Sequence, residues 1–206
     1  MSNLVKYVKN CGDKTFDEYP FNEVDAAIYT ILPYLNFMGI INEPTILKDA
    51  YLKSENRFLL KDKNKFMEEN KKLFKVMAES NRYKNNIITN YKKLVNNETQ
   101  FGAITIKVPK HFKFIAFEGT DDELVGWEEN FKMGYMYPIP AQIEAIKYLK
   151  ENIFVNDFVV YVGGHSKGGN LAIASCMEQN FLKKYQVDFD ECRRCVSFTQ
   201  WWVIKE

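Results

Sequence analysis

The sequence predicts an α/β fold, in which a mostly parallel sheet is flanked by helices and preceded by a helical region. From residue 100 on, strand-like apolar runs alternate with helical patterns in the order strand, helix, strand, helix, strand. The first hundred residues instead repeat their apolar side chains at helical spacing. We therefore expect a mostly helical region at 1–99, packed on an α/β core at 100–206.

The N-terminal region contains several candidate helices. Asp25 can cap a helix that Pro33 ends or kinks. Two amphipathic helices with solvated charged faces are expected between residues 61 and 97; a basic partner-binding surface is the alternative, which the interspersed glutamates weaken. Their apolar positions are Phe66, Leu73, Phe74 and Met77 in the first, and Ile87, Ile88, Tyr91, Leu94 and Val95 in the second.

The C-terminal part begins with two strand-like runs that predict a hairpin, Phe101–Val108 and Phe112–Phe117. A helix opened by Pro140 follows, with an apolar stripe at Ile143, Ile146, Leu149 and Ile153. The remaining expected elements are a buried strand at Phe158–Val162, a helix from Gly169 to about Lys184, and a strand at Val196–Phe198.

The most informative stretch is VVYVGGHSKGGNLA, residues 159–172, where a buried strand meets a helix at a glycine-rich turn. Gly164, Ser166 and Gly168 match G-x-S-x-G, the pattern of a nucleophile elbow, and the two glycines let strand and helix approach closely. The Lys167 N–H, at the helix N-terminus, is then placed to stabilise an oxyanion. A phosphate-cradling turn is the alternative, but the full P-loop pattern is absent.

Together with FIAFEGTDDELVGWEENFKMGYMYPIPAQ, residues 114–142, this stretch resembles a bacterial family of lipase-like proteins of uncharacterised activity. That family is similar to the class 3, fungal-type lipases of the α/β-hydrolase superfamily. The resemblance implies an α/β-hydrolase-like sheet, Ser166 as nucleophile, Thr120 as the second oxyanion donor, and no metal or organic cofactor. Thr120 also fits a capping box with Glu123, so it can equally start a helix.

A general base for Ser166 is harder to find. In this superfamily an Asp or Glu and then a His follow the serine, but the chain's two histidines are His111 and His165. We expect His165 to pack toward the sheet and His111 to lie in the hairpin turn, far from the serine. Asp188, Asp190 and Glu191 are expected to be loop carboxylates.

After residue 198 the family pattern is lost, which suggests a C-terminally truncated hydrolase core. These observations predict a lipase- or esterase-like serine hydrolase that is weak or inactive because its triad is incomplete. The alternatives are a non-catalytic ligand-binding protein of the same fold, and a truncated remnant whose terminal strand leaves a sheet edge open to self-association.

Composition excludes several other classes of protein. With 28 basic and 27 acidic residues the net charge is +1, which favours neither nucleic acid nor an anionic membrane as partner. A small-molecule or lipid ester as substrate is what the resemblance to lipases implies. The N-terminus lacks a signal-peptide core, and the apolar stretch 26–41 is short for a membrane span, so we expect a soluble, cytoplasmic protein without stable membrane insertion.

Two further groups of residues have ordinary explanations. The four cysteines, including the Cys192–Cys195 pair, are expected to be reduced thiols rather than metal ligands. The aromatics Trp127, Phe131, Tyr135 and Tyr137 are expected in the core, with an acyl pocket as the alternative.

Overall fold

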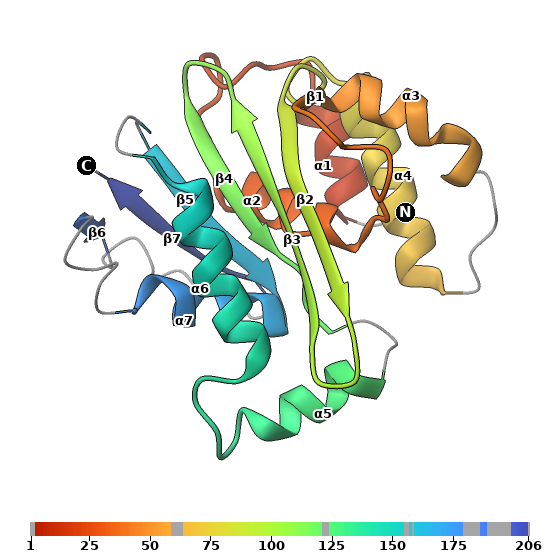
Figure 1. Ribbon diagram of the computed structural model, residues 1–206. Coiled ribbons are helices and arrows are strands. Elements are labelled where there is room, and N and C mark those ends of the chain that lie inside the picture. Colours follow the sequence, from red (N-terminus) through yellow and green to blue (C-terminus); the bar gives the residue numbers. More distant parts are fainter. Residues whose placement is uncertain are drawn as a thin grey trace.

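The computed structural model describes residues 3–58, 64–120, 124–154, 157 and 159–178, together with the backbone of 186–188 and 199–205. The helices are α1 (Asn3–Cys11), α2 (Glu23–Tyr29), η1 (Leu32–Tyr34, a 3-10 turn), α3 (Leu47–Phe58), α4 (Lys65–Glu79), α5 (Leu124–Lys132), α6 (Pro140–Asn152) and α7 (Lys167–Cys176). The strands are β1 (Thr45–Ile46), β2 (Ile87–Val95), β3 (Gln100–Val108), β4 (Phe112–Phe117), β5 (Val159–His165), β6 (Gln186–Asp188) and β7 (Thr199–Lys205). They form one sheet in the order β1-β2-β3-β4-β5-β7-β6, with α1 to α4 on one side and α6 and α7 on the other (Figure 1).

The prediction of a mostly parallel, α/β-hydrolase-like sheet is wrong, because the sheet is mixed and mainly antiparallel. Among the described strand pairs, β4 and β5 run parallel, whereas β1–β2, β2–β3, β3–β4, β5–β7 and β6–β7 are antiparallel. Short turns join β2 to β3 and β3 to β4. Because a short turn reverses the direction of the chain, each of these two pairs is antiparallel. Between β4 and β5 the chain runs through α5 and α6, which is long enough for a parallel return.

The hairpin predicted from the two aromatic-rich runs is confirmed as β3 and β4, which pair from Ala103–Phe117 to Val108–Phe112. The strand expected at 196–198 lies outside the described residues. Instead β7 follows at the point where the sequence departs from the family pattern, and it pairs antiparallel with β5. The terminal strand therefore lies between β5 and β6 rather than at the sheet edge.

The second amphipathic helix predicted between 61 and 97 is wrong, because this segment is strand β2. Thr89 pairs with Thr105 but Lys92 pairs with Ala103, so β2 carries one extra residue in a bulge. Asn90 lies in this bulge with a positive φ of 54°. The extra residue breaks the alternation of side chains between the two faces, and the resulting spacing of apolar residues imitates a helix. The first predicted helix is confirmed as α4.

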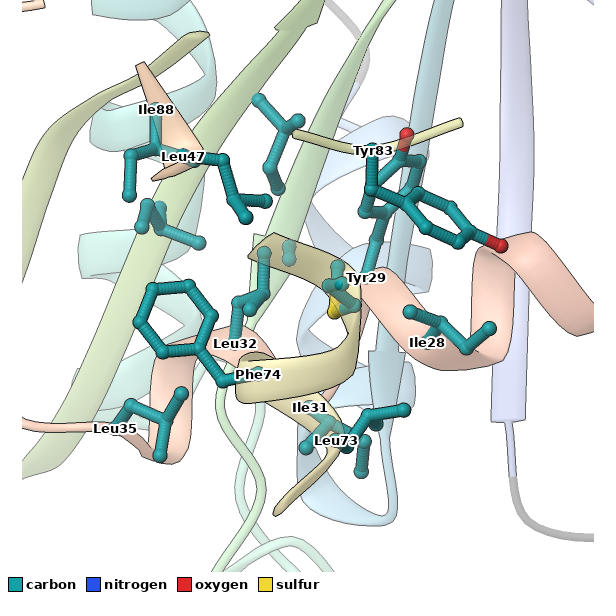
Figure 2. Packing of buried hydrophobic residues seen from close by; sticks show 14 of the residues in the cluster. Ile28, Tyr29, Ile31, Leu32, Leu35, Leu47, Leu73, Phe74, Tyr83 and Ile88 are labelled. Carbon is teal, nitrogen blue, oxygen red and sulfur yellow. The ribbon is translucent and has the colours of Figure 1, made fainter. Parts of the chain in front are cut away.

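One hydrophobic core lies between the N-terminal helices and the sheet. Figure 2 shows its central side chains, from α2, η1, α3, α4 and β2. The α2 helix is capped by Asn22 rather than by Asp25, whose carboxylate closes a capping box onto the Asn22 N–H at 3.0 Å. Asp25 is fully buried, and it pairs with the buried Arg82 and accepts a hydrogen bond from Tyr83. A polar cluster thus lies inside this core, and it joins α2 to the turn that follows α4.

A second core fills the other face, under α6 and α7. Alternate residues of β3 and β4 point to the two faces: Phe101 and Phe117 belong to this core, whereas Ile104 and Ala116 belong to the first. Within the predicted apolar stripe of α6, Leu149 and Ile153 are buried but Ile143 is 40% exposed. The buried face of α6 is completed by Ala141, Ala145 and Tyr148. The two alanines let the helix approach the sheet closely on this face, and Ile143 is turned outward.

None of the helices within the described ranges is both long enough and apolar enough to cross a membrane. The predicted division at residue 99/100 falls in the turn between β2 and β3, where the Asn96 N–H donates to the Thr99 carbonyl at 3.0 Å. The N-terminal part therefore contributes strands β1 and β2 to the same sheet as the C-terminal part.

Candidate functional site

The candidate site is the turn between β5 and α7, where Ser166 occupies a conformation that side chains rarely adopt. Its φ is 56° and its ψ is −124°, which lies outside the regions open to L-residues without strain. Such a conformation costs on the order of 1–3 kcal/mol and persists only where the surrounding structure enforces it. Ser166 is exposed, and its hydroxyl makes no capping hydrogen bond to α7. The strained turn therefore leaves Ser166 exposed to solvent.

The glycines on either side of the serine are required by close packing of backbones. A Cβ on Gly164 would collide with the backbone of Gly168, and a Cβ on Gly168 would collide with the Phe117 carbonyl oxygen. The first turn of α7 thus lies directly against the ends of β4 and β5. Side chains at these two positions would push the helix away from the sheet and change the turn.

The loop after β4 lies beside the serine turn. Phe117 pairs with Gly164 across the parallel strands, so both segments leave the sheet at the same end. A Cβ built on Gly119 would lie 3.2 Å from the Ser166 Cβ and would collide with the His165 carbonyl oxygen. The fold therefore brings together the two motifs that the sequence singled out, although they lie far apart in the chain.

Thr120 follows Gly119 in this loop and is half-buried. Its hydroxyl oxygen accepts a hydrogen bond from the Asn130 amide of α5 at 2.8 Å, which leaves the hydroxyl proton for another acceptor. The other members of the expected capping box, residues 121–123, lie outside the described residues. The structure thus places Thr120 in the loop next to the serine turn, joined to α5 through its side chain.

The Lys167 side chain is directed away from the serine, into a fully buried ion pair. Its ammonium lies 2.9 Å from a Glu129 carboxylate oxygen, with both side chains 0% exposed. It also donates to the Gln100 carbonyl at 2.8 Å and to the Gln100 side-chain oxygen at 2.6 Å. Glu129 in turn accepts from the backbone N–H groups of Gln100 and Ala141, each at 3.1 Å. Lys167 is therefore fixed between α5 and β3, and its own backbone N–H belongs to the positive end of α7.

Sequence reasoning missed Glu129 and Gln100. Glu129 stands in the run Glu128-Glu129-Asn130, which has the charge pattern of a solvated helix face, and Gln100 precedes an apolar strand. One local signal did exist, namely a lysine in the tightly packed turn beside the serine. If such a lysine is buried, its charge needs an anionic partner. No spacing rule links that lysine to a helix 38 residues earlier.

Neither histidine hydrogen-bonds the serine hydroxyl in the part of the chain that the structure describes. The His165 Nδ1 lies 3.0 Å from the Tyr34 hydroxyl, and its ring stacks on Phe66 with centroids 6.0 Å apart. Burial lowers the pKa of His165 below its usual value, because desolvation disfavours the charged imidazolium. His111 lies beyond the other end of β4, where its ring contacts Phe16.

The side chains of the three expected loop carboxylates after Ser166 lie outside what the structure describes. Asp190 and Glu191 lie outside the described residues. Only the backbone of Asp188 is described, and it lies in strand β6 rather than in the expected loop. Within the described ranges, no group of His, Cys, Asp and Glu could hold a metal ion. Cys11 and Cys176 form no disulfide bond there, whereas Cys192 and Cys195 lie outside those ranges.

The aromatics near the site are on the surface, so their expected place in the core is wrong. Trp127 is 56% exposed, Phe131 76%, Tyr135 75% and Tyr137 67%. Trp127 and Phe131 lie on α5, whose buried side faces Gln100 and Thr120 through Gly126 and carries Glu129. The polar network occupies the inner side of α5, and the apolar side chains are therefore turned outward.

One comparison with known proteins covers this region. The model of the Mbeg1-like family matches residues 77–189, more than half of the 206-residue chain. The matched range includes the Gly119 loop, helix α5 with Glu129, and the Ser166 turn. Searches of curated proteins and of solved structures gave no significant match. On the family match, the chain belongs to the Mbeg1-like family, which is related to lipase-like proteins.

Proposed function

We propose that this protein is a lipase- or esterase-like serine hydrolase in which Ser166 accepts the acyl group of a small-molecule or lipid ester. The observation that carries the proposal is the strained, exposed Ser166 at the start of α7, beside the Gly119 loop. A backbone strain of this kind at an exposed hydroxyl is characteristic of functional sites. Membership of a family related to lipase-like proteins supports the same interpretation.

The proposed chemistry is acyl transfer in two steps. The Ser166 oxygen attacks the ester carbonyl, its hydroxyl proton passes to hydroxide or a buffer base, and the carbonyl oxygen gains negative charge. The Lys167 N–H and the N–H or hydroxyl of Thr120 stabilise this oxyanion, assisted by the partial positive charge at the N-terminus of α7. The ester C–O bond then breaks, and the leaving alkoxide takes a proton from solvent to depart as the alcohol. Water attacks the acyl-serine, which releases the acid and restores the hydroxyl.

The expected turnover is low, because neither imidazole of the chain is placed to take the serine proton. His165 is bound to Tyr34, and His111 lies beyond the opposite end of β4. In serine hydrolases, loss of the histidine lowers kcat by a factor on the order of a million. Oxyanion stabilisation and binding alone leave an acceleration of about a thousand-fold over water. With neither imidazole in place among the described residues, we expect hydroxide or a buffer base to remove the proton, and acylation to be slow and to require alkaline pH.

The second candidate is a binding protein without catalysis, which the positions of the two histidines favour. In that case the serine turn and the Gly119 loop would hold an ester or carboxylate through hydrogen bonds, without covalent chemistry. The two candidates differ in whether a covalent acyl-serine forms.

Treatment with p-nitrophenyl acetate at alkaline pH, followed by peptide mass mapping, tests the proposal. Acylation should map to the peptide that contains Ser166, at a rate well above that of other hydroxyls in the chain. A Ser166→Ala variant, which removes only the hydroxyl, should lose this modification. Absence of acyl-Ser166 in the folded wild-type protein would refute the hydrolase proposal and leave the binding function.

A further inference from the structure

We propose that Tyr34 and Gln100 are positioning residues, which hold the Gly119 loop at a fixed place and orientation beside Ser166. The inference rests on the proposed function, because it concerns the oxyanion donor that the loop would offer. Neither side chain is required to touch the substrate. Both act through the backbone of Gly119.

Gln100 fixes the peptide group that carries the Thr120 N–H. Its side-chain amide donates to the Gly119 carbonyl oxygen at 3.2 Å. That oxygen and the Thr120 N–H belong to the same planar trans peptide, so they point in opposite directions. Because the carbonyl is held, the direction of the N–H is held as well. Gln100 is 0% exposed, so water does not compete for this bond.

Tyr34 fixes the preceding peptide group. The Gly119 N–H donates to the Tyr34 hydroxyl oxygen at 3.0 Å, and the Tyr34 ring packs edge-on against Phe66. Tyr34 is 7% exposed and comes from η1, in the N-terminal region. The two polar backbone groups of Gly119 are therefore each bonded to a buried side chain.

The same two side chains reach the residues directly before and after the serine. The Tyr34 hydroxyl lies 3.0 Å from the His165 Nδ1, and the Gln100 side-chain oxygen accepts from the Lys167 ammonium at 2.6 Å. His165 and Lys167 are thus each joined to Gly119 through a single intermediate. This arrangement meets the requirement of the strained Ser166 turn, which persists only if its neighbours are fixed.

A second consequence concerns the relative position of the two proposed donors. The Ser166 carbonyl accepts from the Gly169 N–H at 2.9 Å, which fixes the peptide that carries the Lys167 N–H. With the Thr120 peptide fixed by Gln100, both donors keep a constant spacing before substrate arrives. Preorganised donors of this kind need no reorientation as the oxyanion forms.

The test compares Tyr34→Phe and Gln100→Met with a matched control, Tyr148→Phe. Tyr148 is also buried, at 2% exposed, and its hydroxyl likewise makes two hydrogen bonds, to Thr105 and to the Asn90 carbonyl, away from the serine turn. For each folded variant, the concentration dependence of Ser166 acylation by p-nitrophenyl acetate separates the acylation rate constant from apparent binding. The exchange rates of the Gly119 and Thr120 amides are measured by NMR.

Loosened donors should lower the acylation rate constant about ten-fold or more, with apparent binding within about two-fold, since complete loss of one donor costs about 10²–10³. Amide exchange at Gly119 and Thr120 should accelerate in both variants and not in the control. Acylation rates equal to that of the control, or unchanged exchange, would overturn the positioning role while leaving the proposed function standing. Absence of acylation in the wild type would overturn the proposed function, and this inference with it.

Discussion

The buried pair of Lys167 and Glu129 allows a quantitative prediction, because both side chains are 0% exposed and 2.9 Å apart. Replacing Glu129 by Gln leaves the ammonium buried with the two Gln100 oxygens. It also replaces one of the two oxygens that accept from backbone N–H groups with an NH2 group, which cannot accept. Breaking such a pair typically costs 3–5 kcal/mol, so we expect Glu129→Gln and Lys167→Met each to lower the free energy of unfolding by about 3 kcal/mol.

The double variant should lose much less than the sum of the single variants. With both charges removed, no unpaired ion of this pair remains in the interior, and the neutral amide that replaces the Glu129 carboxylate can still bond to Gln100. We expect a loss of about 4 kcal/mol instead of about 6, a coupling of about 2 kcal/mol. The free energies of unfolding of the wild type, the two single variants and the double variant are measured by urea unfolding, monitored by circular dichroism. The comparison requires equal m-values.

An exposed ion pair on another helix serves as the control for this cycle. Lys72 and Glu69 of α4 lie 3.2 Å apart, but the lysine side chain is 59% exposed. Their coupling should stay below about 0.5 kcal/mol, because water and salt screen the charges. Additive losses at Lys167 and Glu129, with a coupling no larger than that of the control, would refute the claim that this pair is desolvated.

Three further predictions concern the turn, the N-terminal core and pH. Gly168→Ala should destabilise the fold by about 1–3 kcal/mol and slow Ser166 acylation, because the new methyl group collides with the Phe117 carbonyl oxygen. Thermal melts and acylation rates measure the two effects. A melting temperature equal to that of the wild type would contradict this prediction. Arg82→Met should cost about 3–5 kcal/mol in urea unfolding, because Asp25 keeps a buried, uncompensated charge; a loss under about 1 kcal/mol would contradict this account. Burial lowers the pKa of His165 in the folded state, so the unfolded chain binds the proton more tightly and stability should fall as pH drops below the unfolded value of about 6.5. His165→Gln should remove this part of the pH dependence, and an identical dependence in the variant would count against it.

The backbone geometry of the serine turn was more predictable from sequence than the sheet was, for a physical reason. A glycine-flanked serine between a strand and a helix constrains the local backbone so strongly that few residues suffice to recognise it. The β3–β4 hairpin was equally local, since two aromatic-rich runs flank the Pro109–Lys110 turn. Strand direction elsewhere depends on which segments pair, and the pairing of β5 with β7 leaves no signature in either strand.

The errors in the sequence interpretation came from positions where tertiary contacts override local spacing. The bulge at Asn90 gave strand β2 the apolar spacing of a helix. The aromatics Trp127 and Phe131 of α5 were assigned to the core because aromatic side chains are usually buried, whereas the buried side of this helix carries Glu129. Only the position of Lys167 in the folded chain shows that Glu129 faces inward.

The mixed sheet does not weaken the case for the site, because the site depends on one parallel pair of strands. The Gly119 loop and the Ser166 turn lie together because β4 and β5 end at the same edge, with Phe117 opposite Gly164. Antiparallel pairing of β3 with β4 then adds Gln100, since β3 begins at the edge where β4 ends. A fully parallel sheet would place the end of β3 there instead, and the residue that orients the Gly119 carbonyl would have to come from another part of the chain.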